Sequence, residues 1–193
     1  MQCNFTHDDR RQRGGKLKQL IVRKLIVDNQ NDLFDAQGMK YIEFASDYTK
    51  VREYAAFVLQ ECPEQFKEGS LLEQQISEII KNGIKHGNRC DPAKKIRIWY
   101  DLRRRVRLIV EDEGEGFTEL DDWNDFLVQR QTALYNSDFD LFLELAAWKG
   151  KNSGPDDGGN SLIAALEYWN GGMVYSMKKN KIGVVRWYTN GSA

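Results

Sequence analysis

Net charge and cysteine are both scarce in this sequence, and each scarcity narrows the functions it can have. The 28 Lys and Arg residues nearly balance the 29 Asp and Glu residues, which leaves a formal charge of −1. No global field would therefore draw the chain to DNA or to an anionic membrane, although a local basic patch stays open. The three cysteines, Cys3, Cys62 and Cys90, share no metal-ligand spacing, which indicates a reducing compartment.

Long apolar runs are absent as well. The N-terminal segment has no signal-peptide core, and no run approaches the ~20 apolar residues that a membrane helix needs. We therefore expect a cytoplasmic protein that makes no contact with a membrane. Its 193 residues, of which 41% are hydrophobic, can bury a sizeable core and most simply form one domain with a terminal extension.

The common motifs for dinucleotide, P-loop and calcium sites are also missing. No G-x-G-x-x-G opens a helix after a first strand, and no G-K-[ST] occurs. An EF-hand that began at Asp112 would need acidic or amide side chains where the sequence has Gly114 and Gly116, and glycine where it has Phe117. These three classes of site are therefore excluded.

Hydrophobic periodicity predicts an alternation of strands and helices after a loose N-terminus. The predicted strands cover residues 16–27, at an edge of the sheet, then 39–45, 94–100 and 106–112, and a final hairpin covers 172–189 with its turn at 180–182. The predicted helices cover residues 48–62, capped by Ser46 or Asp47, then 71–86, two pieces within 118–149, and 161–169. The apolar faces of the two pieces are Trp123, Phe126 and Leu127, and then Leu141, Phe142 and Leu145. The strands at 94–100 and 106–112 are close enough in sequence to form an antiparallel hairpin.

The helix predicted over Leu71–His86 carries the first candidate site residues. Its apolar positions fall on one side and would pack on a sheet; they are Leu72, Ile76, Ile79, Ile80, Gly83 and Ile84. Glu78 and Asn82 lie on the flank, four residues apart, so both could act on a single ligand. A solvated helix face has the same pattern, and the pair alone does not decide between the two.

The run "VEDEGEGF", Val110 to Phe117, ends an apolar strand with four acids and two glycines. A surface turn explains the glycines but not the apolar strand before them. In a nucleotide pocket, one carboxylate at a strand end can accept the amino hydrogens of adenine, and nearby glycines let backbone and base approach closely. Asp112, Gly114 and Gly116 have that spacing. The Gly-rich segment before residue 161 then opens a helix whose free N–H groups favour phosphate oxygens.

These motifs together resemble the Bergerat, or GHKL, ATPase superfamily, the fold of histidine-kinase ATP domains. "SEIIKNGIKHGN" resembles the N-box helix of anti-sigma-factor serine kinases, and "EDEGEGF" resembles the D-x-G-x-G box. "DDGGNSLIAALEYWNGGMVYS" loosely resembles the later glycine box with its helix and strand. The resemblance runs from about Met39 to Thr189.

The resemblance implies an α+β fold, a two-layer α/β sandwich whose mixed, mostly antiparallel sheet has helices on one face. It divides the chain into an N-terminal extension, residues 1–38, and a histidine-kinase-like ATP-binding domain, residues 39–193. A helical lid insert would span about residues 118–157. This insert is rich in Asp and Trp and longer than an ordinary lid, so it is also a candidate partner-binding surface.

Residue by residue, the resemblance assigns Asp112 to adenine, and Gly114 and Gly116 to the pocket floor. Asn82 would ligate Mg²⁺, whose other ligands would be phosphate oxygens and water, and Glu78 would be the general base. Backbone amides near Gly158 and Gly159 would hold the phosphates of ATP. His86 lies inside the N-box, which favours a structural or pocket-rim role over a phospho-accepting one.

The resemblance implies an ATP-dependent serine/threonine protein kinase that phosphorylates a small antagonist protein and binds a sigma factor, with a homodimer as an open alternative to a monomer. The later glycine box departs from the usual G-x-G-L, and Asp156 and Asp157 would lie close to the triphosphate. The alternative is therefore a nucleotide-dependent protein-binding module that has lost transfer chemistry. The arginines near 103–107 are read as a solvated hairpin tip rather than a nucleic-acid site.

Overall fold

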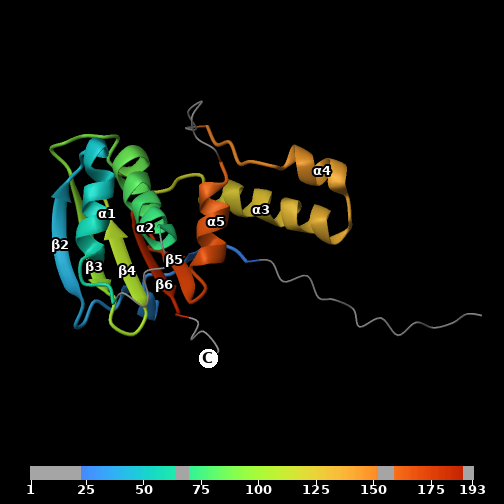
Figure 1. The fold of residues 1–193 in the computed structure, drawn as a ribbon. Helices are drawn as coiled ribbons and strands as arrows, with labels where there is room; N and C mark the ends of the chain where they lie inside the picture. The colour runs from blue at the N-terminus through green and yellow to red at the C-terminus, as the bar shows by residue number, and fades with distance from the viewer. Residues whose placement is uncertain (1–22, 64–69, 152–158, 189–193) are drawn as a thin grey trace, which may run out of the picture.

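One mixed β-sheet with helices packed on it forms the body of the protein, an α+β fold (Figure 1). The computed structural model describes residues 23–63, 70–151 and 159–188. In these residues the strands are β1 (Ile26–Val27), β2 (Lys40–Ala45), β3 (Lys95–Asp101), β4 (Val106–Glu111), β5 (Gly172–Tyr175) and β6 (Lys181–Arg186). The α-helices are α1 (Val51–Leu59), α2 (Leu71–Asn82), α3 (Leu120–Tyr135), α4 (Phe139–Glu144) and α5 (Ser161–Tyr168), with short helices η1 (Asp32–Phe34), η2 (Tyr48–Lys50) and η4 (Gly83–Gly87).

The sheet is mostly antiparallel, as predicted. Its strand order in the described chain is β1-β5-β6-β4-β3-β2, and the β1–β5 pair is parallel whereas the other neighbours are antiparallel. The β3–β4 hairpin pairs Trp99 with Ile109. Every second residue of β3 is buried, beginning with Ile96 and Ile98. Because side chains alternate across a sheet, this period of two turns one apolar face of β3 towards the core.

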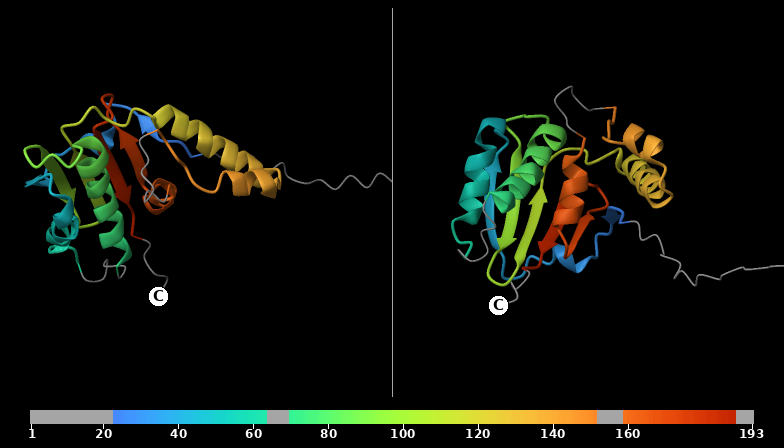
Figure 2. Two further views of the ribbon diagram at one scale, coloured as in Figure 1. Left: turned by 90° about the horizontal axis from the view of Figure 1, so that it is seen from above. Right: turned by 45° about the vertical axis from the view of Figure 1, so that its right-hand side comes forward.

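Helices α1, α2 and α5 cover one face of the sheet and complete a two-layer sandwich (Figure 2). The apolar side of α2 is buried as the sequence predicts, with Leu72, Ile76 and Ile80 at most 1% exposed. Burying each such side chain contributes about 1.5–3 kcal/mol, so this helix is held mainly by its packing on the sheet. The packing fixes which flank of α2 is left to face a ligand.

The segment predicted as a helical lid insert contains α3 and α4, which project away from the sheet (Figures 1 and 2). The prediction of two helical pieces is confirmed for residues 120–144, whereas residues 152–157 lie outside the described chain. Trp123, Phe126 and Leu127 are buried as expected. Leu141 was expected on an apolar inner face but is exposed, because Phe142 occupies the inner position under the Arg130 side chain.

β1 lies at one edge of the sheet, where it pairs with β5. The first strand was predicted over residues 16–27, but residues 23–25 are not in a strand, because the Leu25 backbone bonds to the Asn124 side chain instead. Residues 16–22 lie outside the described part. The expected reversal at residues 180–182 is wrong in position, since β6 already begins at Lys181. The chain turns over Ser176–Asn180 instead, where the Lys179 N–H donates to the Ser176 carbonyl at 2.8 Å and Lys179 adopts φ 61°.

Among the described helices, none is both long and apolar enough to cross a membrane.

Candidate functional site

Asp112 lies directly after β4, where its backbone is fixed by the turn between β5 and β6. Its N–H donates to the Asn180 carbonyl at 2.9 Å, and the Asn180 side-chain amide donates to the Asp112 carbonyl at 2.7 Å. The Gly114 N–H donates to Asp112 Oδ1 at 2.8 Å. The carboxylate therefore has a defined direction before any ligand arrives.

The Asp112 carboxyl group is mostly buried, and burial raises its pKa from 3.8 to about 6. The hydrogen bond from Gly114 and the positive charge of Lys178 both act against this rise, but they are outweighed. Within the described chain, Gly114 supplies the N–H that bonds to this carboxylate. An ionised carboxylate accepts several hydrogen bonds, so Asp112 retains acceptor capacity for a donor on a ligand.

Glycines surround Asp112 on the side of α2 and η4. A Cβ at position 87 would lie 2.3 Å from Asp112 Cγ, and a Cβ at position 114 would lie 2.1 Å from the Gly87 carbonyl oxygen. A Cβ at position 83 would lie 3.6 Å from Asp112 Cβ. No side chain fits at 87 or 114, so these positions bring the end of the predicted N-box against the predicted D-x-G-x-G box.

The predicted helix over Leu71–His86 changes character where it passes Asp112. It is α-helical to Asn82 and continues as the π-helix η4, in which the Asn88 N–H donates to the Gly83 carbonyl at 2.8 Å. A π-turn widens a helix by one residue per turn and is frequent at functional sites. The widened turn presents Gly83 and Gly87 to the Asp112 side chain, which helical periodicity alone could not reveal.

Asn88 is a structural residue of the site that the sequence reasoning missed. It is fully buried, its amide donates to the Lys95 carbonyl at 2.9 Å, and its Oδ1 accepts from the Glu113 N–H at 2.8 Å. It therefore ties the end of η4 to both β3 and the acidic loop. The available signal was a single Asn after "KHG", which is typical of an ordinary turn.

Glu78 and Asn82 lie one turn apart on α2, as predicted, and Asn82 precedes Gly83 at the Asp112 contact. Glu78 Oε1 accepts from the Lys81 ammonium group at 2.5 Å. Glu78 Oε2 is buried and has no hydrogen-bond partner among the described residues, and Gln75 Oε1, one turn earlier, is in the same state. Two unpaired buried acceptors on one flank are costly unless a ligand uses them. His86 is exposed, which suits a rim position.

The remaining predicted glycines lie apart from the Asp112 carboxylate. Gly116 has φ 92°, and a Cβ there would lie 1.9 Å from the Lys178 carbonyl oxygen, so it packs on the β5–β6 turn. Gly159 has φ 65° and packs on the Trp148 backbone just before α5, whereas Gly158 lies outside the described residues. The side chain of Asn160, the N-cap residue of α5, makes no capping hydrogen bond. Helix α5 lies beside α2 (Figure 1), so these N–H groups are on the same side of the sheet as Glu78 and Asn82.

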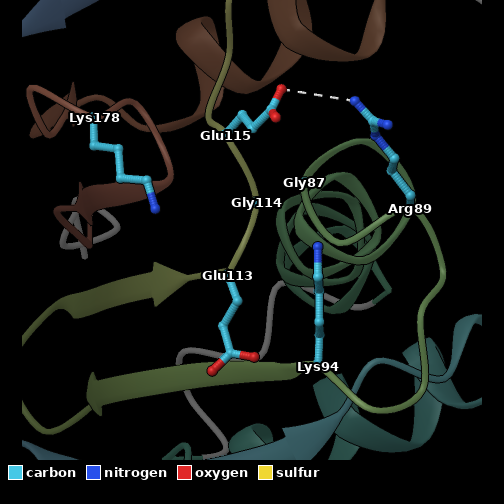
Figure 3. Close-up of a pocket in the computed structure, with 7 residues that line it drawn as sticks. All are labelled: Gly87, Arg89, Lys94, Glu113, Gly114, Glu115 and Lys178. Atoms are coloured by element: carbon cyan, nitrogen blue, oxygen red, sulfur yellow. Dashed lines mark ion pairs between the residues drawn. The ribbon is translucent and has the colours of Figure 1, made fainter.

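An open pocket of about 330 Å³ lies next to the acidic loop, and Figure 3 shows its lining. The Lys94 and Lys178 side chains extend to either side of the Gly114 segment, and Arg89 pairs with Glu115 at 3.7 Å. Gly114, a predicted site residue, lines this pocket. Gly87, which was not among the predicted site residues, also lines it. Lys94 and Lys178 are close enough to lower the pKa of Asp112, which links the pocket electrostatically to the carboxylate.

The arginines near the β3–β4 turn bind to their own chain. Arg103 pairs with Asp101 at 2.8 Å, and Arg107 donates to the Asp35 carbonyl at 2.6 Å. The Arg105 guanidinium lies over the Trp187 ring at 4.5 Å. Arg103, Arg105 and Arg107 are thus each held by a contact within the described chain, and the Arg103 charge is paired with a carboxylate.

Similarity to known proteins covers a limited part of the chain. No known protein-family model matches it. A stretch of 69 residues is 35% identical to the anti-sigma F factor of Shouchella clausii (strain KSM-K16), which amounts to 35% of this chain and 47% of that protein. The chain thus spans about half the length of the curated relative it matches, and what it shares with that protein is a local sequence similarity.

Proposed function

We propose that this chain binds ATP with Mg²⁺ beside Asp112 and acts as a regulatory protein of the anti-sigma-factor serine/threonine kinase type. The observation that carries the proposal is the contact of the Asp112 carboxylate with the backbone of Gly87. This contact joins the acidic loop to the helix that bears Glu78 and Asn82. Both predicted motifs therefore take part in one arrangement.

The residues present fit an adenine nucleotide. A buried carboxylate with spare acceptor capacity suits the exocyclic amino group of adenine, and the open pocket beside the acidic loop, lined by Gly87 and Gly114, would admit a flat base. Lys94 and Lys178 lie near the rim and would favour an anionic ligand. Asp112 would thus select the base, while the positive charges would strengthen attraction for the whole nucleotide.

The flank of α2 suits the phosphate end. Asn82 would hold Mg²⁺ through its side-chain oxygen, and the ion would neutralise charge on the phosphate oxygens. The uncapped N–H groups at the start of α5 would bind phosphate oxygens, with the left-handed Gly159 turning the chain into the helix. Glu78 Oε2, buried and unpaired, would accept a hydrogen bond from an incoming hydroxyl.

Glu78 would then act as general base on a serine or threonine of the protein substrate. It would take the hydroxyl proton as the hydroxyl oxygen bonds to the γ-phosphorus, and the bond from that phosphorus to the bridging oxygen of ADP would break. The products are a phosphorylated protein, ADP, and a protonated Glu78 that returns its proton to water. The 69-residue similarity to an anti-sigma F factor supports a sigma factor or its small antagonist protein as partner.

One observation favours the alternative, a nucleotide-dependent binding module without transfer chemistry. The Lys81 ammonium group holds Glu78 Oε1 at 2.5 Å on the surface of α2. An ion pair of this kind competes with the hydroxyl for the carboxylate. In this reading ATP shapes the insert for a partner and is not consumed.

Calorimetric titration of ATP with Mg²⁺ tests the premise that both readings share. We expect saturable binding to the wild type and at least a tenfold weaker affinity for Asp112→Asn, whose amide cannot accept both adenine hydrogens in the same way. An absence of heat with the wild-type protein, confirmed by a second binding method, would contradict both readings.

Glu78→Gln separates the two readings, because the amide keeps the size of the side chain but cannot take a proton. We expect it to bind ATP with near wild-type affinity and to lose phosphoryl transfer to the antagonist protein by about 100-fold or more. Lys81→Met is the matched variant, because it removes the competing cation and should leave transfer intact or faster. Equal transfer rates in the wild type and Glu78→Gln would remove Glu78 from the mechanism.

A further inference from the structure

The tip of the helical insert exposes large apolar side chains far from the sheet. Leu134 lies in the last turn of α3, and Phe139 and Leu143 lie on α4, with exposed fractions of 51%, 62% and 69%. Phe139 and Leu143 are four residues apart, so they lie one turn above each other on one side of α4. We name these three residues the insert tip. An exposed apolar cluster of this kind usually marks an interaction site.

The insert tip is surrounded by negative charge. Residues 120–149 contain six carboxylates and two basic side chains, a formal charge of −4, although the whole chain carries −1. Asp138, Asp140 and Glu144 lie on either side of Phe139 and Leu143 and are all exposed. The two basic side chains do not neutralise the tip, because Lys149 lies beyond α4 and Arg130 is turned inward.

Arg130 fixes how α4 presents its outer face. Its guanidinium lies over the Phe142 ring at 4.3 Å, and its Nε donates to the Leu145 carbonyl at 3.1 Å. The Asp138 side chain caps α4 by accepting from the Leu141 N–H at 3.2 Å. With Phe142 and Leu145 held against α3, Phe139 and Leu143 are directed outward together with Asp140 and Glu144.

We propose that the insert tip is the docking surface for a basic amphipathic helix of a protein partner. Apolar side chains of such a helix would cover Phe139, Leu143 and Leu134, while its Lys or Arg residues would face Asp138, Asp140 and Glu144. This inference names the surface of this chain that contacts the partner, and it rests on the proposed regulatory role. It does not depend on the proposed nucleotide site at Asp112, because α3 and α4 project away from the sheet (Figure 1).

Charge complementarity also decides between this partner and a second copy of the chain. In a two-fold dimer through the tips, Asp140 and Glu144 of one protomer would face the same carboxylates of the other. Like charges at an interface are repulsive and disfavour such pairing. A basic helix has no such penalty.

The test uses a fluorescent synthetic helix of Leu and Lys in an amphipathic order as the probe, with fluorescence anisotropy as the measurement. We expect saturable binding by the full chain. For Phe139→Ser/Leu143→Ser, the affinity should fall by about tenfold or more. Asp140→Lys/Glu144→Lys should weaken binding by a similar factor and reduce its salt dependence. Tyr41→Ser, an exposed aromatic on β2, is the matched control and should bind as the wild type does.

Two further peptides make the result decisive. A peptide of the same composition in a non-amphipathic order, and an amphipathic peptide of Leu and Glu, should both bind at least tenfold more weakly. Equal binding of the reordered peptide, or unchanged binding by the serine variant, would overturn the proposal. So would a wild-type dimer in sedimentation that the serine variant converts to a monomer. Titration of ATP into the same variants separates a failure of the docking proposal from a failure of the proposed nucleotide binding, because the insert-tip changes should leave nucleotide affinity unchanged.

Discussion

The backbone of Gly87 lies against the carboxylate of Asp112, so closely that a Cβ at position 87 would lie 2.3 Å from Asp112 Cγ. Gly87 ends the π-helix that continues α2, and Asp112 follows β4. Through this contact, two motifs 25 residues apart in sequence form one candidate site. The relationship leads to predictions that can be checked without knowing the partner.

Gly87→Ala should disrupt the candidate site. The new methyl group would overlap the Asp112 carboxylate, which must rotate away, and we expect ATP affinity to fall at least tenfold in calorimetry. Gly83→Ala is the graded comparison, because its Cβ would meet the flexible Ile96 Cδ1 at 3.1 Å and Asp112 Cβ at an ordinary 3.6 Å. A smaller loss for Gly83→Ala is expected. Equal affinities for Gly87→Ala and the wild type would contradict the placement of the nucleotide beside this contact.

Asp112→Asn should stabilise the fold near neutral pH even as it impairs binding. The pKa of Asp112 is raised to about 6 by burial, so its contribution to stability is present below pH 3.8 and lost as pH rises through 6. Asn has no charge to bury and can still accept from the Gly114 N–H. We expect the unfolding free energy at pH 7.5 to rise by about 1–2 kcal/mol, discounted for partial exposure from the ~3 kcal/mol that the shift would imply.

Urea unfolding of the wild type and Asp112→Asn at several pH values measures this effect. The stability gain should shrink steadily as the pH is lowered from 7 towards 4, because the wild-type carboxyl then becomes neutral as well. A gain that is independent of pH would point to packing rather than to ionisation of Asp112.

ATP affinity should depend on pH through the same group. An ionised carboxylate accepts a hydrogen bond from the adenine amino group more strongly than a protonated one, so binding should be constant above pH 7 and weaken as the pH falls through 6. Lys178→Met removes a positive charge that lowers the pKa of Asp112, so the midpoint should move to higher pH. Titrations across this range with an inert background buffer give the midpoint directly. A midpoint unmoved in Lys178→Met would mean that another group controls binding.

Asn88→Ala should destabilise the junction between η4, β3 and the acidic loop. The substitution removes the hydrogen bonds to the Lys95 carbonyl and from the Glu113 N–H, both part-buried, at the position of a fully buried side chain, a cost of about 2–4 kcal/mol. Urea unfolding measures the loss, and Gln74→Ala, an exposed change on α2, should stay within about 0.5 kcal/mol of the wild type. Comparable losses for the two variants would show that the Asn88 hydrogen bonds contribute little.

Local pattern was enough to predict most of the elements. The period of two in "KKIRIWY" and "VRLIVED" predicts the β3–β4 hairpin, and the apolar side of α2 is buried at the positions that helical geometry assigns. Such patterns succeed because burial of one face of a strand or helix is the main source of stability, and it is written in neighbouring residues. The edge position of β1 and the two pieces of the insert follow from the same reasoning.

Features that depend on close contact between distant segments could not be predicted from local sequence patterns. The π-turn at Gly83–Gly87 depends on the Asp112 side chain, which arrives from another element, and the same "KHG" could continue an α-helix in a different setting. The β5–β6 turn begins earlier than expected because Asn180 is held by Asp112 rather than by its own neighbours. The exposure of Leu141 likewise depends on Arg130 lying over Phe142.

By itself, the sequence determined the α+β class, the order of most elements and the candidate residues Glu78, Asn82 and Asp112, since periodicity and motif spacing are local properties. Only the tertiary structure decided that Asp112 meets Gly83 and Gly87, that Asn88 joins three elements, and that the insert tip leaves Phe139 and Leu143 exposed. The physical reason is that steric contact, burial and hydrogen bonding across elements depend on how distant segments pack together.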